Sequence, residues 1–425
     1  MNKKTLVLLT DNYPDTAGEF FLDDELKIIA PSFEKIIVIQ KKSNEPSCKH
    51  YTPKNLTLYI YPNTNNFLDY LGVIPLCFRF FFIKELFGAK KLFKISYSIL
   101  QIKIMIVELL WGNKLKKEII KVVRKEKLDI NKTLFYSYWS DYKSMGLALY
   151  KNKFPSALCF ARVHGWDVDY SRHKFPYLPF KNYVVSQLNR VFAISEKSQQ
   201  LFFNLIEADL KPKIFISRLG KTNYNSPQCE KKNKDIVICS CSDFISLKRI
   251  HLIIDILSNI KSPNIEWIHF GGGILKEEME KYAQKKLSHI KYSFKGIVPN
   301  EEIIKFYSEN FIDLFINVSE TEGIPVSIME AQSFGIPTLA TNVGGTSEIV
   351  NNENGFLIEK DFNPKLVADL ITQYFSSDVQ TQRQKRIAAF KNWSEKYNAE
   401  MNYSLYLSQI QFITDSNEKS TYSGL

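Results

Sequence analysis

Residues 319–350 read SETEGIPVSIMEAQSFGIPTLATNVGGTSEIV, and the placing of their glycines and prolines is typical of an α/β protein. Gly323 and Pro325 open the stretch as a loop, and apolar residues at helical spacing follow. Gly335 stands where a helix usually ends, and Pro337 forbids its continuation. A β-rich run, a Gly-Gly turn and a second helix start come next. The order loop, helix, strand, turn, helix predicts half of a doubly wound α/β unit.

Two glutamates, Glu322 and Glu330, frame the first of these helices. Seven residues separate them, close to two helical turns, so both side chains project towards one side. The helix N-terminus carries unpaired N–H groups and the positive end of the dipole, which suits a phosphate. A glutamate further in can accept hydrogen bonds from a ribose diol, and Gly323 lets a backbone approach a ligand. A phosphate-and-sugar ligand fits this pattern. On spacing alone, a capping Glu322 and a solvated Glu330 are the better interpretation.

The whole stretch resembles the E-x7-E segment of retaining glycosyltransferases of the family-4 type, which have the GT-B fold. It matches their Glu-Gly-x-Pro opening, their Glu-Ala pair, and the Gly-x-Pro and Gly-Gly-x-x-Glu elements, all in register. The resemblance implies an α/β protein of two doubly wound Rossmann-like domains that face each other across a cleft. It implies that Glu322 is catalytic, beside the donor sugar, and that Glu330 binds the nucleotide ribose. The backbone at Gly323 and Ile324 would then stabilise the departing diphosphate.

Two further stretches of the second half carry the same resemblance. Relatives place an arginine five residues ahead of a lysine, and the two clamp the donor diphosphate. Here Lys248 matches the lysine, but Asp243 occupies the arginine position. Because an aspartate cannot bind a phosphate, neighbouring Arg249 is expected to supply the second charge, or the clamp is weaker. In the family the nucleobase packs near the loop that holds Val298. We therefore assign Lys248, Arg249 and Val298 to donor binding.

In the first half, a histidine follows an apolar strand-like run in the order His164-Gly-Trp-Asp167. This His-Gly-x-Asp resembles a short motif of the same transferases. It implies that His164 takes part in catalysis by orienting the sugar, and that Asp167 binds sugar or acceptor hydroxyls. By itself a single histidine is more often structural. The loop after the first expected strand holds Asn12 and Glu19, which we also assign to acceptor or sugar binding because ligands bind where such strands end.

The length of 425 residues is too great for one ordinary core. We expect an N-terminal Rossmann-like acceptor domain over residues 1–220, a polar linker over 221–235 and a nucleotide-sugar domain over 236–380. Terminal helices and a polar tail occupy 381–425, and the helices are expected to cross back to the first domain. The six cysteines lack C-x-x-C spacing, which indicates reduced thiols of a cytosolic protein.

The formal net charge of +11 calls for an explanation. The lysines are spread out and no nucleic-acid motif is present, so nucleic acid is not expected as a partner. Basic and aromatic residues are densest over 78–103, where their alternation suggests an amphipathic helix on an anionic membrane surface. A core-packing helix with solvated lysines fits the same pattern and stays open. No uncharged apolar run reaches the ~18 residues that span a bilayer. We therefore expect a cytoplasmic protein, at most peripheral on the inner face of the cell membrane.

Together these patterns predict a retaining glycosyltransferase. It would move a sugar from a nucleotide-sugar donor to a hydroxyl of a glycan acceptor, expected to be a lipid-linked oligosaccharide. We place the reaction in bacterial surface polysaccharide synthesis, of O-antigen, capsule or exopolysaccharide. No Asp-x-Asp metal motif is visible where a cation would be needed, so we expect no metal ion and no other cofactor. The alternatives are a non-catalytic nucleotide-sugar-binding protein, which Asp243 permits, and a GT-B epimerase or phosphorylase.

Overall fold

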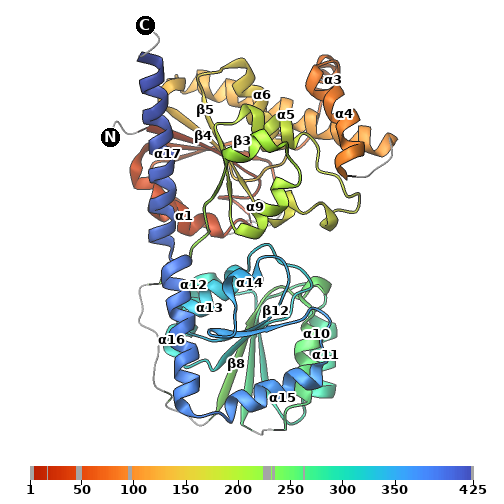
Figure 1. Ribbon diagram of the computed structural model, residues 1–425, viewed down its shortest axis with the longest axis vertical. Coiled ribbons are helices and arrows are strands. Elements are labelled where there is room, and N and C mark those ends of the chain that lie inside the picture. Colours follow the sequence, from red (N-terminus) through yellow and green to blue (C-terminus); the bar gives the residue numbers. More distant parts are fainter. Residues whose placement is uncertain are drawn as a thin grey trace. The chain divides into compact units, whose positions relative to one another are not determined.

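The computed structural model describes residues 4–16, 18–44, 50–93, 98–223, 231, 235–261 and 264–422. The chain forms two compact units (Figure 1). The first unit comprises Met1–Leu219 together with Glu400–Leu425, and the second comprises Gly220–Ala399. The first unit is therefore discontinuous in sequence, because the last segment of the chain returns to it.

A parallel sheet of seven strands, in the order β3-β2-β1-β4-β5-β6-β7, forms the centre of the first unit. Its central strands are nearly continuous apolar runs, as expected where helices cover both faces of a parallel sheet. The strands are β1 (Lys4–Thr10), β2 (Phe33–Lys41), β3 (Leu56–Tyr61), β4 (Thr133–Ser137), β5 (Leu158–Val163), β6 (Arg190–Ala193) and β7 (Ile214–Ile216). The strand order reverses between β1 and β4, so the loops that follow these two strands diverge there.

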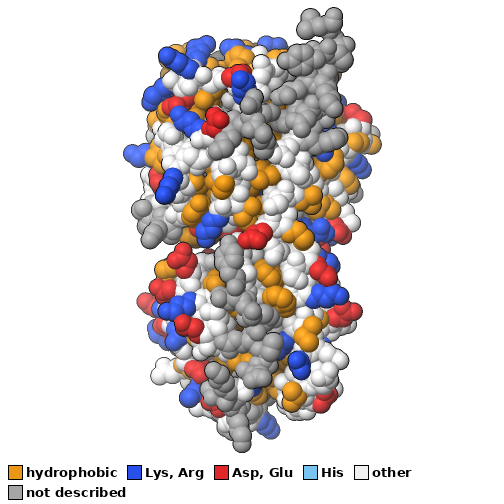
Figure 2. Space-filling model, turned by 90° about the vertical axis from the view of Figure 1, so that its left-hand side faces the viewer, with side chains coloured by type: hydrophobic (Ala, Val, Ile, Leu, Met, Phe, Trp, Pro, Cys, Tyr) orange, Lys and Arg blue, Asp and Glu red, His pale blue; other side chains and the backbone are white. Residues whose placement is uncertain are grey.

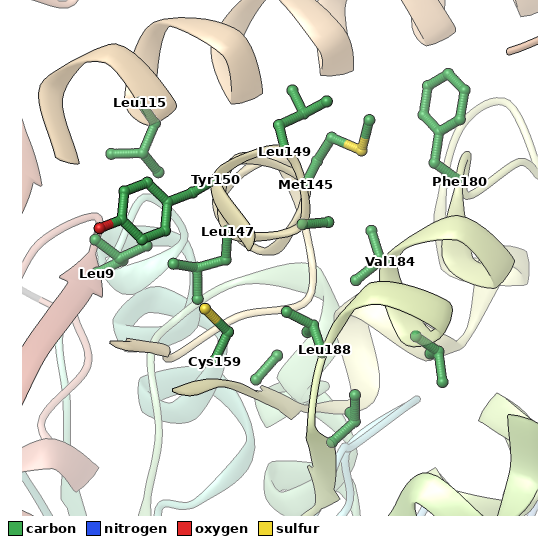
Figure 3. Close-up of a cluster of buried hydrophobic side chains, with 14 of the residues drawn as sticks. Leu9, Leu115, Met145, Leu147, Leu149, Tyr150, Cys159, Phe180, Val184 and Leu188 are labelled. Atoms are coloured by element: carbon green, nitrogen blue, oxygen red, sulfur yellow. The ribbon is translucent and has the colours of Figure 1, made fainter. Parts of the chain in front are cut away.

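The helices of the first unit are α1 (Phe21–Ile29), α2 (Phe67–Leu71), α3 (Ile74–Cys77), α4 (Phe80–Phe93), α5 (Ile99–Lys125), α6 (Tyr142–Lys153), α7 (Gly165–Val168), α8 (Lys181–Gln187), α9 (Glu196–Phe203) and α17 (Ala399–Tyr422). Helix α6 lies between α5 and the sheet, and apolar side chains on opposite sides of α6 fill both contacts (Figure 3). Gly112 of α5 and Gly146 of α6 let the two backbones approach, since a Cβ on Gly146 would lie 3.0 Å from the Gly112 carbonyl oxygen.

Helix α17 closes the first unit over a buried charge. Arg162 of β5 is fully buried and lies 3.3 Å from the carboxylate of Glu25. Its Nε donates to the Tyr136 hydroxyl at 2.6 Å, and its Nη1 donates to the Ser217 carbonyl at 3.0 Å. The ring of Tyr406, from α17, lies 5.0 Å from the guanidinium. Buried charges persist when they are paired and hydrogen-bonded, so these contacts fix where the last helix docks.

The second unit has a parallel sheet of six strands in the order β10-β9-β8-β11-β12-β13. Its strands are β8 (Ile236–Cys241), β9 (Ile265–Phe270), β10 (Lys291–Gly296), β11 (Leu314–Asn317), β12 (Thr338–Thr341) and β13 (Gly355–Ile358). Its helices are α10 (Ile250–Ser258), α11 (Lys276–Lys286), α12 (Asn300–Glu309), α13 (Val326–Ser333), α14 (Thr346–Ile349), α15 (Pro364–Phe375) and α16 (Val379–Lys396). Apolar side chains of α10, α11 and α15 form its main core with the sheet. The predicted order over residues 319–350 is observed.

Two stretches differ in extent from the sequence prediction. The amphipathic helix expected over 78–103 is instead α4 followed by the start of α5, and residues 94–97 between them lie outside the described part of the chain. The return to the first unit begins at Glu400 rather than at residue 381. Helix α16 stays with the second unit because it packs on α13, where Asn392 Nδ2 donates to Gln332 Oε1 at 2.8 Å.

On the face drawn in Figure 2, lysine and arginine side chains are scattered and acidic ones lie among them, with no single basic stripe. Within the described residues, none of the helices combines the length and the apolar character that a membrane span requires.

Candidate active site

In the second unit the strand order reverses between β8 and β11, and the loops after these strands hold the predicted donor-binding residues. Such a reversal opens a crevice at the carboxyl ends of the strands, which is where ligands bind in doubly wound sheets. The loop after β8 leads to Lys248 at the end of a short 3-10 helix (Ser246–Lys248). The loop after β11 leads through Glu322 to α13.

Lys248 and Glu322 meet directly across this reversal. The Nζ of Lys248 lies 2.6 Å from Oε1 of Glu322, and Nδ2 of Asn317 donates to the same oxygen at 3.3 Å. Both charged side chains are mostly buried. A mostly buried ammonium beside a carboxylate forms a stronger pair than an exposed one.

Arg249 supports the loop that carries Glu322. It has a left-handed backbone with φ 49° at the start of α10. Its Nε donates to the carbonyl of Val318 at 2.7 Å, and its terminal nitrogens donate to the carbonyls of Lys360 at 2.9 Å and Ser319 at 3.3 Å. Three of its nitrogens thus donate to backbone carbonyls.

Glu330 is buried on α13 and is held by two polar side chains. Its Oε1 accepts a hydrogen bond from Nδ2 of Asn300 at 2.8 Å and lies 3.1 Å from Nζ of Lys221. Burial raises the pKa of the Cys241 thiol at the end of β8, the charge of Glu330 raises it further, and Lys248 lowers it. One thiol therefore lies within electrostatic reach of both groups.

A glycine turn packs against the backbone of the predicted diphosphate loop. The amide of Gly345 donates to the carbonyl of Gly323 at 2.8 Å. Gly344 has φ 55°, and a Cβ there would lie 1.8 Å from the carbonyl oxygen of Glu322. Ile324 is buried beside this turn. The Gly-Gly pair therefore fixes the path of the chain from Glu322 into α13.

The three glycines after β9 also serve a close contact between backbones. Gly271 has φ 144°, and a Cβ there would lie 1.9 Å from the carbonyl oxygen of Ser242 in the loop after β8. Loop packing alone thus accounts for this glycine. Val298 is half-buried in the loop between β10 and α12, two residues before Asn300. This places the predicted nucleobase loop next to the residue that holds Glu330.

In the first unit Glu19 shapes the loop after β1. It has φ 53° and is buried. Its Oε2 accepts hydrogen bonds from the amides of Asn12 and Tyr13, each at 2.8 Å, and its Oε1 accepts one from Trp139 Nε1 at 2.6 Å. Burial raises its pKa, although Lys143 and the two amides lower it. Asn12 accepts a hydrogen bond at Oδ1 from the Thr16 hydroxyl at 3.1 Å, so both predicted residues bind within their own unit.

A buried lysine joins the loops at the reversal of the first sheet. Lys143, at the start of α6, contacts the carboxylates of Asp11 and Asp141. Burial alone would lower the pKa of Lys143, but the two aspartates raise it above its ordinary value. Burial alone would raise the pKa of Asp11, but Lys143 lowers it. Lys143 and Asp11 are therefore both charged near neutral pH.

His164 and Asp167 lie where β5 ends. The imidazole is buried against the ring of Trp139, with ring centroids 4.3 Å apart. Neither ring nitrogen of His164 has a hydrogen-bond partner among the described residues. Burial, followed by Arg162 and Lys143, lowers the His164 pKa well below its ordinary value, so the ring is neutral. A neutral imidazole with unpaired nitrogens can donate to or accept from a ligand hydroxyl.

Asp167 joins two loops of the first unit. Its carboxylate accepts hydrogen bonds from the amides of Ser140 at 2.6 Å and His164 at 2.5 Å. Burial raises the Asp167 pKa to about 6, against the lowering effects of Lys181 and the two amides. Both of its oxygens are engaged with backbone, so Asp167 holds the backbone of His164 in place.

A family model gives the decisive comparison. The model of the family described as "Glycosyl transferases group 1" matches residues 223–393. This range includes Lys248, Glu322 and Glu330. Residues 223–393 are thus similar to the group 1 glycosyltransferases. The O-antigen biosynthesis glycosyltransferase WbnH of Escherichia coli is 27% identical to the chain over 204 residues, which cover 47% of this chain and 56% of WbnH.

A further curated relative is also a glycosyltransferase, and a solved structure shares the fold. The UDP-Gal:α-D-GlcNAc-diphosphoundecaprenol α-1,3-galactosyltransferase of Escherichia coli is 32% identical over 109 residues, or 24% of this chain and 26% of that protein. The chain thus spans about half the length of the curated relatives it matches, or less. Anabaena HepE, solved with UDP and glucose, is 14% identical and covers 96% of this chain and 99% of its own, with a TM-score of 0.63. This likeness extends over both units and gives the GT-B fold class.

The sequence pattern located Lys248 and Glu322, which the structure brings together, but it missed several groups around the site. Asn300 and Lys221 lie 30 and 109 positions from Glu330 in the chain. Lys143 was not singled out either, since a lysine at the start of a helix is ordinary. Only the polar character of Asn300 directly after Pro299, at a helix start, gave any signal.

Proposed function

We propose that this glycosyltransferase moves a sugar from a nucleoside diphosphate donor to a hydroxyl of a lipid-linked glycan, with retention of configuration. The observation that carries the donor half is the Lys248–Glu322 pair beside the start of α13, together with the buried Glu330 on the same helix. Supporting it, HepE was solved with UDP and glucose. The galactosyltransferase relative is named for a UDP-sugar and a diphosphoundecaprenol acceptor, and WbnH for O-antigen synthesis. We place this chain in bacterial surface polysaccharide synthesis of the same kind.

In this mechanism the second unit handles the leaving group. Negative charge grows on the diphosphate as the bond to the sugar breaks. The ammonium of Lys248 and the amides at Gly323 and Ile324 stabilise that charge. Glu330 accepts hydrogen bonds from the hydroxyls of the ribose. Glu322 orients the donor sugar. The acceptor oxygen bonds to the anomeric carbon as the diphosphate leaves, and the leaving phosphate takes the proton of the acceptor hydroxyl. We propose no metal ion, because Lys248 and the two amides carry the charge stabilisation.

In the first unit, neutral His164 orients the acceptor through its ring nitrogens. Asp167 keeps the backbone of His164 in place and does not contact the sugar directly. Glu19 has the same supporting role for the loop after β1, which includes Asn12. The sequence-based assignment of Asp167 and Glu19 to hydroxyl binding is thus replaced in this proposal by a supporting role, because their carboxylate oxygens bind amides and an indole.

The nucleotide site is tested by Glu330→Ala. Loss of a buried carboxylate that accepts ligand hydroxyls is expected to weaken nucleotide binding by about 10- to 100-fold. Isothermal titration calorimetry with UDP, GDP and ADP measures the change, starting from whichever nucleotide the wild type binds most tightly. Glu302→Ala, an exposed change on α12, is the control. Unchanged affinity in Glu330→Ala would remove this residue from the ribose site. Turnover of a nucleotide-sugar without acceptor would favour an epimerase.

The lipid-linked acceptor predicts membrane attachment, and the first unit carries an apolar surface suited to it. Helices α3 and α4 lie at the outer end of α5, away from the seven-stranded sheet (Figure 1). Phe78 and Phe80 are 78% and 79% exposed there, and Ile99 at the start of α5 is 88% exposed. Further exposed apolar side chains are Phe67 and Leu68 of α2, Ile74 of α3, and Ile83 and Phe87 of α4. An exposed apolar group of this size marks an interaction surface.

Vesicle flotation tests the attachment. Wild-type protein is expected to float with vesicles of phosphatidylcholine and phosphatidylglycerol. The double change Phe78→Ser and Phe80→Ser should weaken flotation by about 100-fold or more, since it removes two large apolar groups. The matched pair Leu366→Ser and Ile387→Ser changes exposed apolar residues of the second unit and should leave flotation intact. Equal flotation of both double variants would contradict a membrane role for α3 and α4.

A further inference from the structure

The two segments that connect the units pair with each other. The chain enters the second unit at Gly220 and leaves it after Ala399. The amide of Lys221 donates to the carbonyl of Tyr397 at 2.9 Å, and the amide of Ala399 donates to the carbonyl of Lys221 at 3.3 Å. Lys221 and Asn398 thus form a parallel β-bridge. The entry and exit of the second unit therefore form one small structural element.

Gly220 makes this pairing tight. A Cβ at this position would lie 2.5 Å from Cα and 2.6 Å from the nitrogen of Ala399. No side chain fits at such a distance without moving the backbone. Nε1 of Trp393, on α16, also donates to the carbonyl of Lys221 at 3.2 Å. A shift of the Lys221 backbone would therefore change hydrogen bonds to both connecting segments and to α16.

The side chain of Lys221 runs from this element to the carboxylate of Glu330. Its Nζ lies 3.1 Å from Glu330 Oε1 and donates to Asn300 Oδ1 at 3.3 Å, while Asn300 Nδ2 donates to the same Glu330 oxygen at 2.8 Å. The Lys221 and Glu330 side chains are 8% and 6% exposed. A buried carboxylate needs such partners, and removing one of them leaves an uncompensated charge. Both contacts reach Oε1, so they do not occupy Oε2.

We propose that Lys221 is a positioning residue for nucleotide binding, which fixes Glu330 for the ribose and links occupancy of that site to the paired connecting segments. The inference rests on the proposed nucleotide site. A bound diol engages the Glu330 carboxylate, and the ammonium that shares this carboxylate belongs to the residue at the centre of the β-bridge. Ligand binding therefore restrains Lys221, and through its backbone it restrains the hydrogen bonds to Tyr397 and Ala399.

A second buried carboxylate, paired with the partly exposed Lys231, provides a control. Lys231 lies 2.8 Å from Asp313, whose side chain is 5% exposed and also accepts the Val237 amide at 2.8 Å. Asp313 directly precedes β11, whereas α13 and Glu330 follow it. The control pair thus lies at the opposite edge of the sheet from the ribose site. It has the same chemistry without a nucleotide beside it.

Calorimetry with the nucleotide that the wild type binds most tightly tests the proposal. Lys221→Met is expected to weaken binding by about tenfold or more, while Lys221→Arg, which keeps the charge, restores most of it. Lys231→Met should lower the unfolding midpoint but leave nucleotide affinity within about twofold. If Lys221→Met and Lys231→Met bind equally well, Lys221 has only a structural role.

Hydrogen exchange distinguishes the two roles, because a purely structural Lys221 would give amide exchange rates that do not depend on nucleotide. Nucleotide should slow exchange of the Lys221 and Ala399 amides in the wild type and in Lys231→Met, but not in Lys221→Met at saturating nucleotide. Unchanged exchange in the wild type overturns the link to the connecting segments. A wild type that binds no nucleotide overturns the proposed function as well. A loss of binding in Glu330→Ala but not in Lys221→Met overturns this inference alone.

Discussion

Lys248→Met is expected to lower the rate of glycosyl transfer by about 100- to 1000-fold. Lys248 supplies the only side-chain ammonium that contacts Glu322 among the described residues, with Nζ 2.6 Å from Oε1. The substitution removes the positive charge that faces the leaving diphosphate. It also leaves the mostly buried Glu322 carboxylate without its cationic partner, which adds a desolvation cost. Steady-state rates with saturating donor measure the first effect.

The control for this change is Lys391→Met. Lys391 is 68% exposed on α16 and faces Glu395 at 3.9 Å, an ion pair of the kind that contributes little. It should leave the rate within about twofold of the wild type. A Lys248→Met enzyme that keeps more than about one tenth of the wild-type rate would show that the leaving group is stabilised by other groups. Arg249, which directly follows Lys248 in the sequence, would then be the first residue to substitute.

Gly344→Ala is expected to destabilise the second unit by more than about 3 kcal/mol and to abolish most of the transfer activity. An alanine there must adopt φ 55° and place its Cβ 1.8 Å from the Glu322 carbonyl oxygen. Because the atom that it meets belongs to the backbone, the collision cannot be relieved by a side-chain rotation. The loop that carries Glu322 must move. Urea unfolding and the transfer rate report these two consequences.

Gly296→Ala separates strain from collision. Gly296 also has a positive φ, of 73°, but the nearest atom to a Cβ there is Lys276 Nζ at 3.9 Å. This variant should lose only about 1 to 2 kcal/mol, the cost of a left-handed backbone for alanine. Equal losses in the two variants would show that the contact between the Gly-Gly turn and Glu322 does not constrain the loop.

The sequence predicted the local order of elements in the second unit because loop, helix and strand signals there are dense. Gly335 and Pro337 end α13 as expected, and the next strand is β12. The same stretch carried the family resemblance that pointed to Glu322. Its contact with Lys248 followed from the order of the strands, since both loops belong to the strands on either side of the reversal.

The sequence pattern could not predict which residues contact the candidate site residues. Nothing in the sequence connects Glu330 with Lys221, because the contact depends on the pairing of two segments that are far apart in the chain. The role of Glu19 was also hidden. Its left-handed backbone turns the carboxylate back onto amides of its own loop, so an acidic residue in a ligand-binding loop turned out to be a support. The sequence also did not predict that Arg162 is buried and charge-paired, because the apolar strand around it gives no sign of an acidic partner.

The docking of α17 has a consequence for how the protein is made. Residues 4–219 leave the ribosome long before the chain reaches Tyr406, whose ring covers the guanidinium of Arg162. Until then the nascent first sheet has Arg162 and Glu25 without this cover, and the second unit is completed in the meantime. Translation order and folding order are thus decoupled: the half of the polypeptide that is synthesised first is the half that finishes last.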